Sequence, residues 1–79
     1  MTPSVVKAKP LRNHLLLLVF YNKEKRVLDM KPFLSDPYWA SISPEPLFNT
    51  VRSDGTSICW SNGVDLSPED AYSFSKPSK

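Results

Sequence analysis

The stretch Trp60-Ser61-Asn62-Gly63-Val64-Asp65-Leu66 is the most informative part of this 79-residue sequence, and it predicts a tight turn between two short strands. Asn-Gly pairs favour such turns, because glycine readily adopts the positive φ that they require. The strands are expected over Ser57 to Trp60 and over Val64 to Leu66. A helix should begin directly afterwards, since Ser67 can cap it and Pro68 suits its first position.

Working outward from this stretch, Leu15 to Tyr21 is the clearest strand candidate. Both of its alternating faces are apolar, so we expect a central strand that is covered on both sides. One cover would be the chain's own helix, and the other a second subunit. Val5 to Leu11 suits an edge strand, because Pro10 has no backbone N–H to donate. Arg26 to Met30 is expected to return antiparallel after a polar turn.

The middle of the sequence is rich in proline, which excludes a long helix from residues 32–46. Short helical turns are expected at Pro32 to Leu34 and at Glu45 to Asn49. Tyr38, Trp39 and Ile42 are expected to fold over the sheet. Further along, Asp54-Gly55 predicts a hairpin between strands over residues 50–52 and 57–60.

These elements predict an α+β fold. It consists of a small, mostly antiparallel sheet of about five or six short strands, with short helices or 3-10 turns in the middle and a short C-terminal helix. Residues 1–75 are expected to form one compact domain, and residues 76–79 a frayed tail.

Composition limits the chemistry that the chain is expected to perform. Cys59 is the single cysteine and His14 the single histidine, so we expect neither a disulfide nor a metal site. Cys59 and His14 also form the one Cys/His pair available for nucleophilic catalysis, and an inert thiol is the commoner finding in a strand. We therefore expect a protein that is not an enzyme and binds no cofactor.

The sequence also bears on location. Its longest apolar run has seven residues, whereas a membrane-spanning helix needs about 20. No secretory signal follows Met1. We therefore expect a cytoplasmic protein with no membrane partner.

Charge is unevenly distributed along the chain. Residues 1–31 hold seven Lys and Arg against two acids, whereas residues 32–79 hold three against six. A basic patch on adjacent strands would suit nucleic acid. The alternative is that these side chains cover the solvated faces of strands and protect sheet edges. The candidate patch consists of Lys7, Lys9, Arg12, Lys25 and Arg26.

A second candidate site lies in and after the opening stretch. Trp60 and Tyr72 are aromatic residues of the type that anchor protein interfaces, and Asn62 and Asp65 lie between them. The competing interpretation is structural. Asn62 would form the turn, Asp65 would accept backbone hydrogen bonds, and Trp60 would fill core space against Tyr72 and Phe74.

The motif Trp-x-Asn-Gly-x-Asp-Leu at residues 60–66, followed by Pro68 and Tyr72, resembles a small bacterial family catalogued as domain of unknown function 2442. Ser61 stands where that family usually has proline. The resemblance implies a compact α+β domain with a mostly antiparallel sheet and no established activity. Some relatives carry an additional helix-turn-helix domain after the tyrosine, which we do not expect here. Others are encoded next to small toxin-like proteins, which implies an antitoxin-like role.

Two functions follow as expectations. The first is a non-enzymatic module that binds another small protein, in an antitoxin-like manner, or pairs with itself as a homodimer. The alternative is a regulator that binds nucleic acid through the basic N-terminal half. A small-ligand site would require a pocket lined by Trp39, Trp60 and Tyr72.

Overall fold

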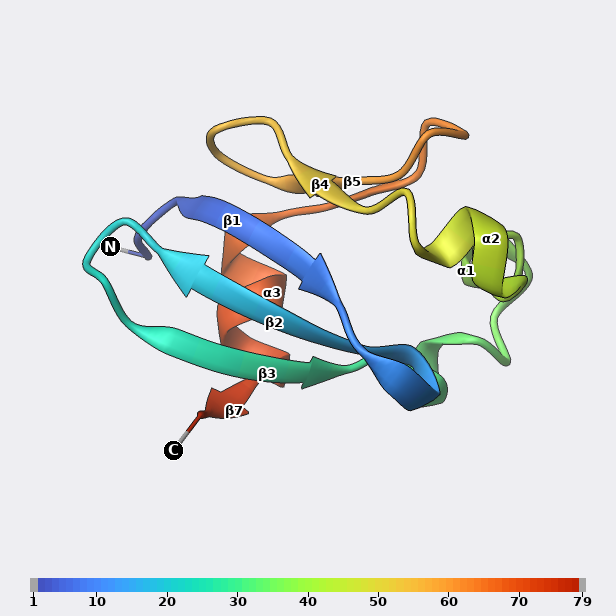
Figure 1. Cartoon of the computed structure of the whole chain (residues 1–79), viewed down its shortest axis with the longest axis horizontal. Coiled ribbons are helices and arrows are strands. Elements are labelled where there is room, and N and C mark those ends of the chain that lie inside the picture. The colour runs from blue at the N-terminus through green and yellow to red at the C-terminus, as the bar shows by residue number, and fades with distance from the viewer. Residues whose placement is uncertain (1, 79) are drawn as a thin grey trace.

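A four-stranded antiparallel sheet is the largest element of the computed structural model, which describes residues 2–78 (Figure 1). The strands lie in the order β1-β2-β3-β7. A smaller sheet has the order β4-β5-β6. The strand bounds are β1 Val5–Pro10, β2 Leu15–Phe20, β3 Lys25–Asp29, β4 Arg52–Ser53, β5 Ile58–Cys59, β6 Asp65–Leu66 and β7 Lys76–Pro77.

Short helical segments connect the strands, because proline repeatedly interrupts the middle of the chain. Two 3-10 turns, η1 and η2, follow β1 and β3, and the longest helix, α3, follows β6. The predicted α+β class is confirmed, with two small sheets where one was expected. The bounds are η1 Arg12–His14, η2 Lys31–Phe33, α1 Pro37–Ala40, α2 Glu45–Phe48 and α3 Pro68–Phe74.

The strand β2 is central, as predicted, with β1 on one side and β3 on the other. Its side chains alternate in burial: Leu16, Leu18 and Phe20 are fully buried, whereas the residues between them are half-buried. In Figure 1, α3 lies behind β1, β2 and β3. Within residues 2–78, no element covers the opposite face of these strands, so the expected second cover is not supplied by the described part of the chain.

The core lies between the large sheet, the small sheet and α3. The two sheets are joined near the start of β1, where the Val5 N–H donates to the Thr56 carbonyl (2.9 Å) and the Ser53 hydroxyl donates to the Val5 carbonyl (2.6 Å). The buried apolar residues are Val5, Leu16, Leu18, Phe20, Leu28, Met30, Ile42, Phe48, Val51, Ile58, Trp60, Val64, Leu66 and Ala71.

The turn predicted from Asn62-Gly63 is present. The Trp60 N–H donates to the Val64 carbonyl (2.9 Å), and the Asn62 side chain accepts from the Val64 N–H (3.2 Å). Gly63 has a φ of +91°, a conformation that L-residues with side chains rarely adopt. The predicted helix cap is also present, since the Ser67 hydroxyl accepts from the Asp70 N–H (3.2 Å).

Two local expectations are corrected. Residues 76–77 do not fray but form β7, which pairs with β3 at Val27–Lys76 and Arg26–Pro77. The Ser78 N–H extends this pairing by donating to the Lys25 carbonyl (3.0 Å); Lys79 lies outside the described residues. Tyr38 does not cover the sheet, because α1 turns it outward and leaves 52% of it exposed.

Candidate functional site

The uncovered side of β1, β2 and β3 is the first candidate surface, and we call it the open face. Its centre is a half-buried aliphatic stripe along β2, formed by Leu15, Leu17 and Val19. Val27 of β3 lies beside Leu17 in the register and widens the stripe. Aliphatic side chains that do not enter the core are a feature of surfaces that bind other molecules.

Lysines frame this stripe on both sides. Cross-strand partners point to the same face of a sheet. Lys7 is paired with Val19 and Lys9 with Leu17 on the β1 side, and Lys25 is paired with Val19 on the β3 side. Lys76 of β7 is paired with Val27. The open face is therefore aliphatic along its centre and positively charged along its edges.

One carboxylate, that of Asp29, also belongs to the open face, opposite Leu15. It forms an ion pair with Lys31 (3.0 Å) and accepts a hydrogen bond from the Lys31 N–H (2.9 Å). These contacts, led by the backbone hydrogen bond, hold the pKa of Asp29 below its ordinary value. Because Lys31 balances its charge locally, Asp29 neutralises little of the lysine frame.

The structure divides the basic patch expected from the sequence. Lys7, Lys9 and Lys25 lie together on the open face. Arg26 points to the opposite side, since it is paired with the buried Leu18. Arg12 lies in the turn η1, beyond the end of β1.

Arg26 has a separate structural role at the C-terminal end of the chain. Its guanidinium donates to the Ser75 hydroxyl (2.7 Å) and to the Ser75 carbonyl (2.7 Å), and it pairs with Glu24 (2.6 Å). It also lies over the Tyr72 ring, 4.1 Å from the centroid. We call this group of four residues the Arg26 latch, because it joins the end of α3 to β3 and to the turn before it.

The latch changes the acidity of two of its members. The hydrogen bond from Arg26, together with one from the Tyr72 hydroxyl, lowers the pKa of Glu24. The same bond to Glu24 (2.9 Å), together with burial, raises the pKa of Tyr72. The hydrogen bond thus favours an ionised Glu24 carboxylate, which accepts it, and a neutral Tyr72 hydroxyl, which donates it. The polar groups of Arg26 and Tyr72 therefore already have partners within the chain.

The second predicted site, formed by Trp60, Asn62, Asp65 and Tyr72, is dispersed. Trp60 is 2% exposed, and its indole donates to the Phe48 carbonyl (3.2 Å). Its aromatic neighbours are Trp39 and Phe48, and not the expected Tyr72 and Phe74.

The other members of that site have surroundings different from those of the Trp60 ring. Tyr72 packs edge-to-face on Phe20. Asn62 and Asp65 are exposed, and the Asn62 amide donates to the Ser41 hydroxyl (3.1 Å). The turn hydrogen bond expected of Asp65 is accepted by Asn62 instead. The structural interpretation of the motif therefore accounts for Trp60, Asn62 and Tyr72.

Exposed apolar residues form surfaces that the sequence analysis missed. Val6 and Tyr21, at 44% and 78% exposure, lie near the end of the open face where β1 begins and β2 ends. Tyr38 and Phe74 are also exposed, and they flank an aromatic pair formed by Phe33 and Trp39. The alternation of side chains between the two faces of β2 could have predicted that Tyr21 points to the open face. No local sequence pattern predicts that Val6 is exposed while Val5 is buried.

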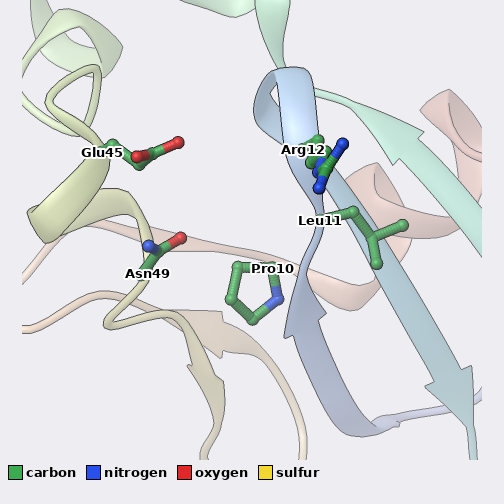
Figure 2. Close-up of a pocket in the computed structure, with 5 residues that line it drawn as sticks. All are labelled: Pro10, Leu11, Arg12, Glu45 and Asn49. Carbon is green, nitrogen blue, oxygen red and sulfur yellow. The ribbon is translucent and has the colours of Figure 1, made fainter.

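A cleft of about 400 Å³ with a mixed polar and apolar lining lies between the end of β1 and α2. It is lined by Pro10, Leu11, Arg12, Glu45 and Asn49. Figure 2 shows Arg12 and Glu45 on opposite walls, with the Pro10 ring between them and the side chain of Leu11 directed away from Glu45. The cleft could accommodate a small polar group.

The residues considered for catalysis or metal binding, Cys59 and His14, have different surroundings. Cys59 is a half-buried free thiol on β5. The His14 ring contacts the Ser43 carbonyl (2.7 Å) and packs edge-to-face on Phe48. Within residues 2–78, no group of three or more His, Cys, Asp or Glu residues is placed to hold a metal ion.

These features define a small α+β domain whose most distinctive surface is an open sheet face. The chain belongs to the family described as protein of unknown function (DUF2442), whose model matches residues 5–77. The resemblance carried by the Trp60–Leu66 motif is thereby confirmed. No curated protein and no solved structure matches the chain. In the stretch from residue 2 to residue 78, none of the helices is long and apolar enough to cross a membrane.

Proposed function

We propose that this protein is a non-enzymatic module that binds another protein through its open face. The observation that carries the proposal is the aliphatic stripe Leu15, Leu17 and Val19, which lies on the central strand yet stays outside the core. Burying such side chains against a partner yields roughly 25 cal/mol for each Å² of apolar surface removed from water. The exposed Val6 and Tyr21 lie near one end of the same strands.

The mode of action that this surface supports is masking. A domain of this size can cover an active or binding surface of its partner without contributing any reacting group. The antitoxin-like role implied by the family resemblance is of this kind, and we propose it as the specific form of the function. We also propose that the protein acts in the bacterial cytoplasm, where the free thiol of Cys59 would stay reduced.

A paired-variant purification tests the proposal. The wild-type chain, Leu17→Asp and Ser73→Asp would each be expressed at native level in the host and purified by a tag. Leu17 lies on the open face, whereas Ser73 is exposed on α3, behind the sheet. We expect one protein to co-purify stoichiometrically with the wild type and with Ser73→Asp, and to be lost with Leu17→Asp. Equal recovery with both variants would show that the partner binds elsewhere.

Nucleic-acid binding is the second candidate, and the lysine frame favours it. Lys7, Lys9, Lys25 and Lys76 share one face, and the exposed ring of Tyr21 offers a stacking surface nearby. Binding of this kind weakens steeply with salt, because each phosphate contact releases counterions. A titration with a single-stranded oligonucleotide at several salt concentrations tests this candidate. Absence of binding at low salt would remove it.

A further inference from the structure

The open face combines aliphatic surface with a positive frame, and this combination restricts what can bind there. Aliphatic side chains at the centre favour apolar side chains of a partner, whereas single-stranded nucleic acid needs aromatic side chains for base stacking in addition to a positive groove. The stripe itself is formed by Leu15, Leu17 and Val19, with no aromatic member. The centre of the face therefore favours a protein segment.

The frame determines the charge of that segment. Lys7 and Lys9 lie on one side of the stripe, and Lys25 and Lys76 on the other. Within residues 2–78, Asp29 is the acidic residue that the register places on this face, and its carboxylate already pairs with Lys31. A second copy packed on the same face would bring lysines against lysines, which disfavours self-pairing. An acidic partner would neutralise the frame.

The spacing of the stripe matches one helix laid along β2. Alternate residues of a strand are about 6.7 Å apart, so Leu15 and Val19 are separated by about 13 Å. Residues i, i+4 and i+8 of a helix span about 12 Å along its axis. Neighbouring strands lie about 4.8 Å away on each side. Lys9 and Lys25 are thus within reach of the side chains that flank the apolar ridge of such a helix.

We infer that the open face binds an amphipathic helix whose narrow aliphatic ridge is flanked on both sides by Asp or Glu. The ridge would pack along Leu15, Leu17 and Val19, and the carboxylates would pair with the lysine frame. This inference rests on the proposed function and adds to it the chemistry of the partner.

Two synthetic helical peptides test the inference. Each would have about 18 residues, enough for measurable helicity in water, with leucine at every ridge position. The acidic peptide carries Glu at the flanking positions, and the basic peptide carries Lys there. We expect the acidic peptide to bind the full chain at least about tenfold more tightly than the basic one, since several partly exposed charge pairs change sign together.

Charge reversal in the protein provides the decisive comparison. The double variant Lys9→Glu/Lys25→Glu leaves Lys7 and Lys76 in place and so makes the frame electrically neutral; it should abolish the preference for the acidic peptide. Arg52→Glu, which reverses an exposed charge on β4, is the control and should leave the preference unchanged. Leu17→Asp should weaken both peptides, because both use the same ridge. Far-ultraviolet circular dichroism establishes that each variant is folded.

The outcomes separate the inference from the function on which it rests. Equal binding of the two peptides by the wild type, or a preference that the double variant leaves unchanged, would overturn the inference. If the native partner were still lost with Leu17→Asp in that case, the open face would remain the binding surface but would recognise another chemistry. Tighter binding of an oligonucleotide than of the acidic peptide would also overturn the inference, in favour of nucleic acid.

Discussion

Leu17 and Leu18 are neighbours on β2 with opposite environments, and comparing them measures how the two sides of the sheet differ. Leu18 is fully buried, whereas Leu17 is half-buried on the open face. Replacing a buried leucine by alanine costs about 2–5 kcal/mol, because transfer energy is lost and a cavity remains. Leu17→Ala loses part of the transfer energy and leaves no enclosed cavity, so we expect a cost of about 1 kcal/mol.

Urea unfolding, followed by the fluorescence of Trp39 and the buried Trp60, provides the assay. A domain of this length is stabilised by about 4–12 kcal/mol in total. We therefore expect Leu18→Ala to remove a large share of the stability and Leu17→Ala a small one. The measurement would be made at two protein concentrations, so that any self-association is detected.

Two results would refute this reasoning. If both variants lost the same free energy of unfolding at low protein concentration, Leu17 would be as buried as Leu18 within one chain. If the cost of Leu17→Ala rose with protein concentration, a second copy would cover the open face, and the argument for an acidic partner would fail.

The Arg26 latch and the turn at Gly63 give three further predictions. Arg26→Met removes an ion pair and the hydrogen bonds to Ser75, so we expect it to destabilise the fold by about 2–4 kcal/mol in urea, against less than about 0.5 kcal/mol for the exposed Arg52→Met. The pKa of Glu24 is lowered in the fold, so its contribution is present above the ordinary glutamate pKa of about 4.3 and is lost as the pH falls below it. As the pH is lowered through this pKa, the urea midpoint should fall less steeply for Glu24→Gln than for the wild type. Parallel plots of midpoint against pH for the two proteins would contradict this. Gly63→Ala should cost about 1–2 kcal/mol in thermal unfolding through backbone strain alone, since an added Cβ meets nothing within 4 Å at a φ of +91°; no loss would show that the turn relaxes.

Local sequence signals predicted the turns and strands well. Asn62-Gly63 fixed one turn and Asp54-Gly55 another, because both need a residue that tolerates positive φ. The central position of β2 followed from its unbroken apolar run, and Ser67 marked the start of α3. In each case the signal lies within a few residues of the element that it specifies.

Long-range arrangements were not predictable in the same way. No residue near Lys76 indicates a strand. The strand β7 forms because the edge of β3 is available for pairing and because Arg26 binds Ser75, from which it is separated by 49 positions in the sequence. The basic patch was predicted only in part, since successive residues of a strand point to opposite faces of the sheet. Lys25 and Arg26 are neighbours in sequence and lie on opposite sides of the sheet for this reason.

The Arg26 latch also has a kinetic consequence. The strands β1, β2 and β3 follow one another along the chain and can form through local contacts, which close quickly. The latch joins residues 24–26 to residues 72–75 and can form only after these two distant segments have met. We expect Arg26→Met to accelerate unfolding while leaving the refolding rate nearly unchanged. The β1–β3 hairpins would then determine the folding rate, and the contacts of the C-terminal end would determine the unfolding rate.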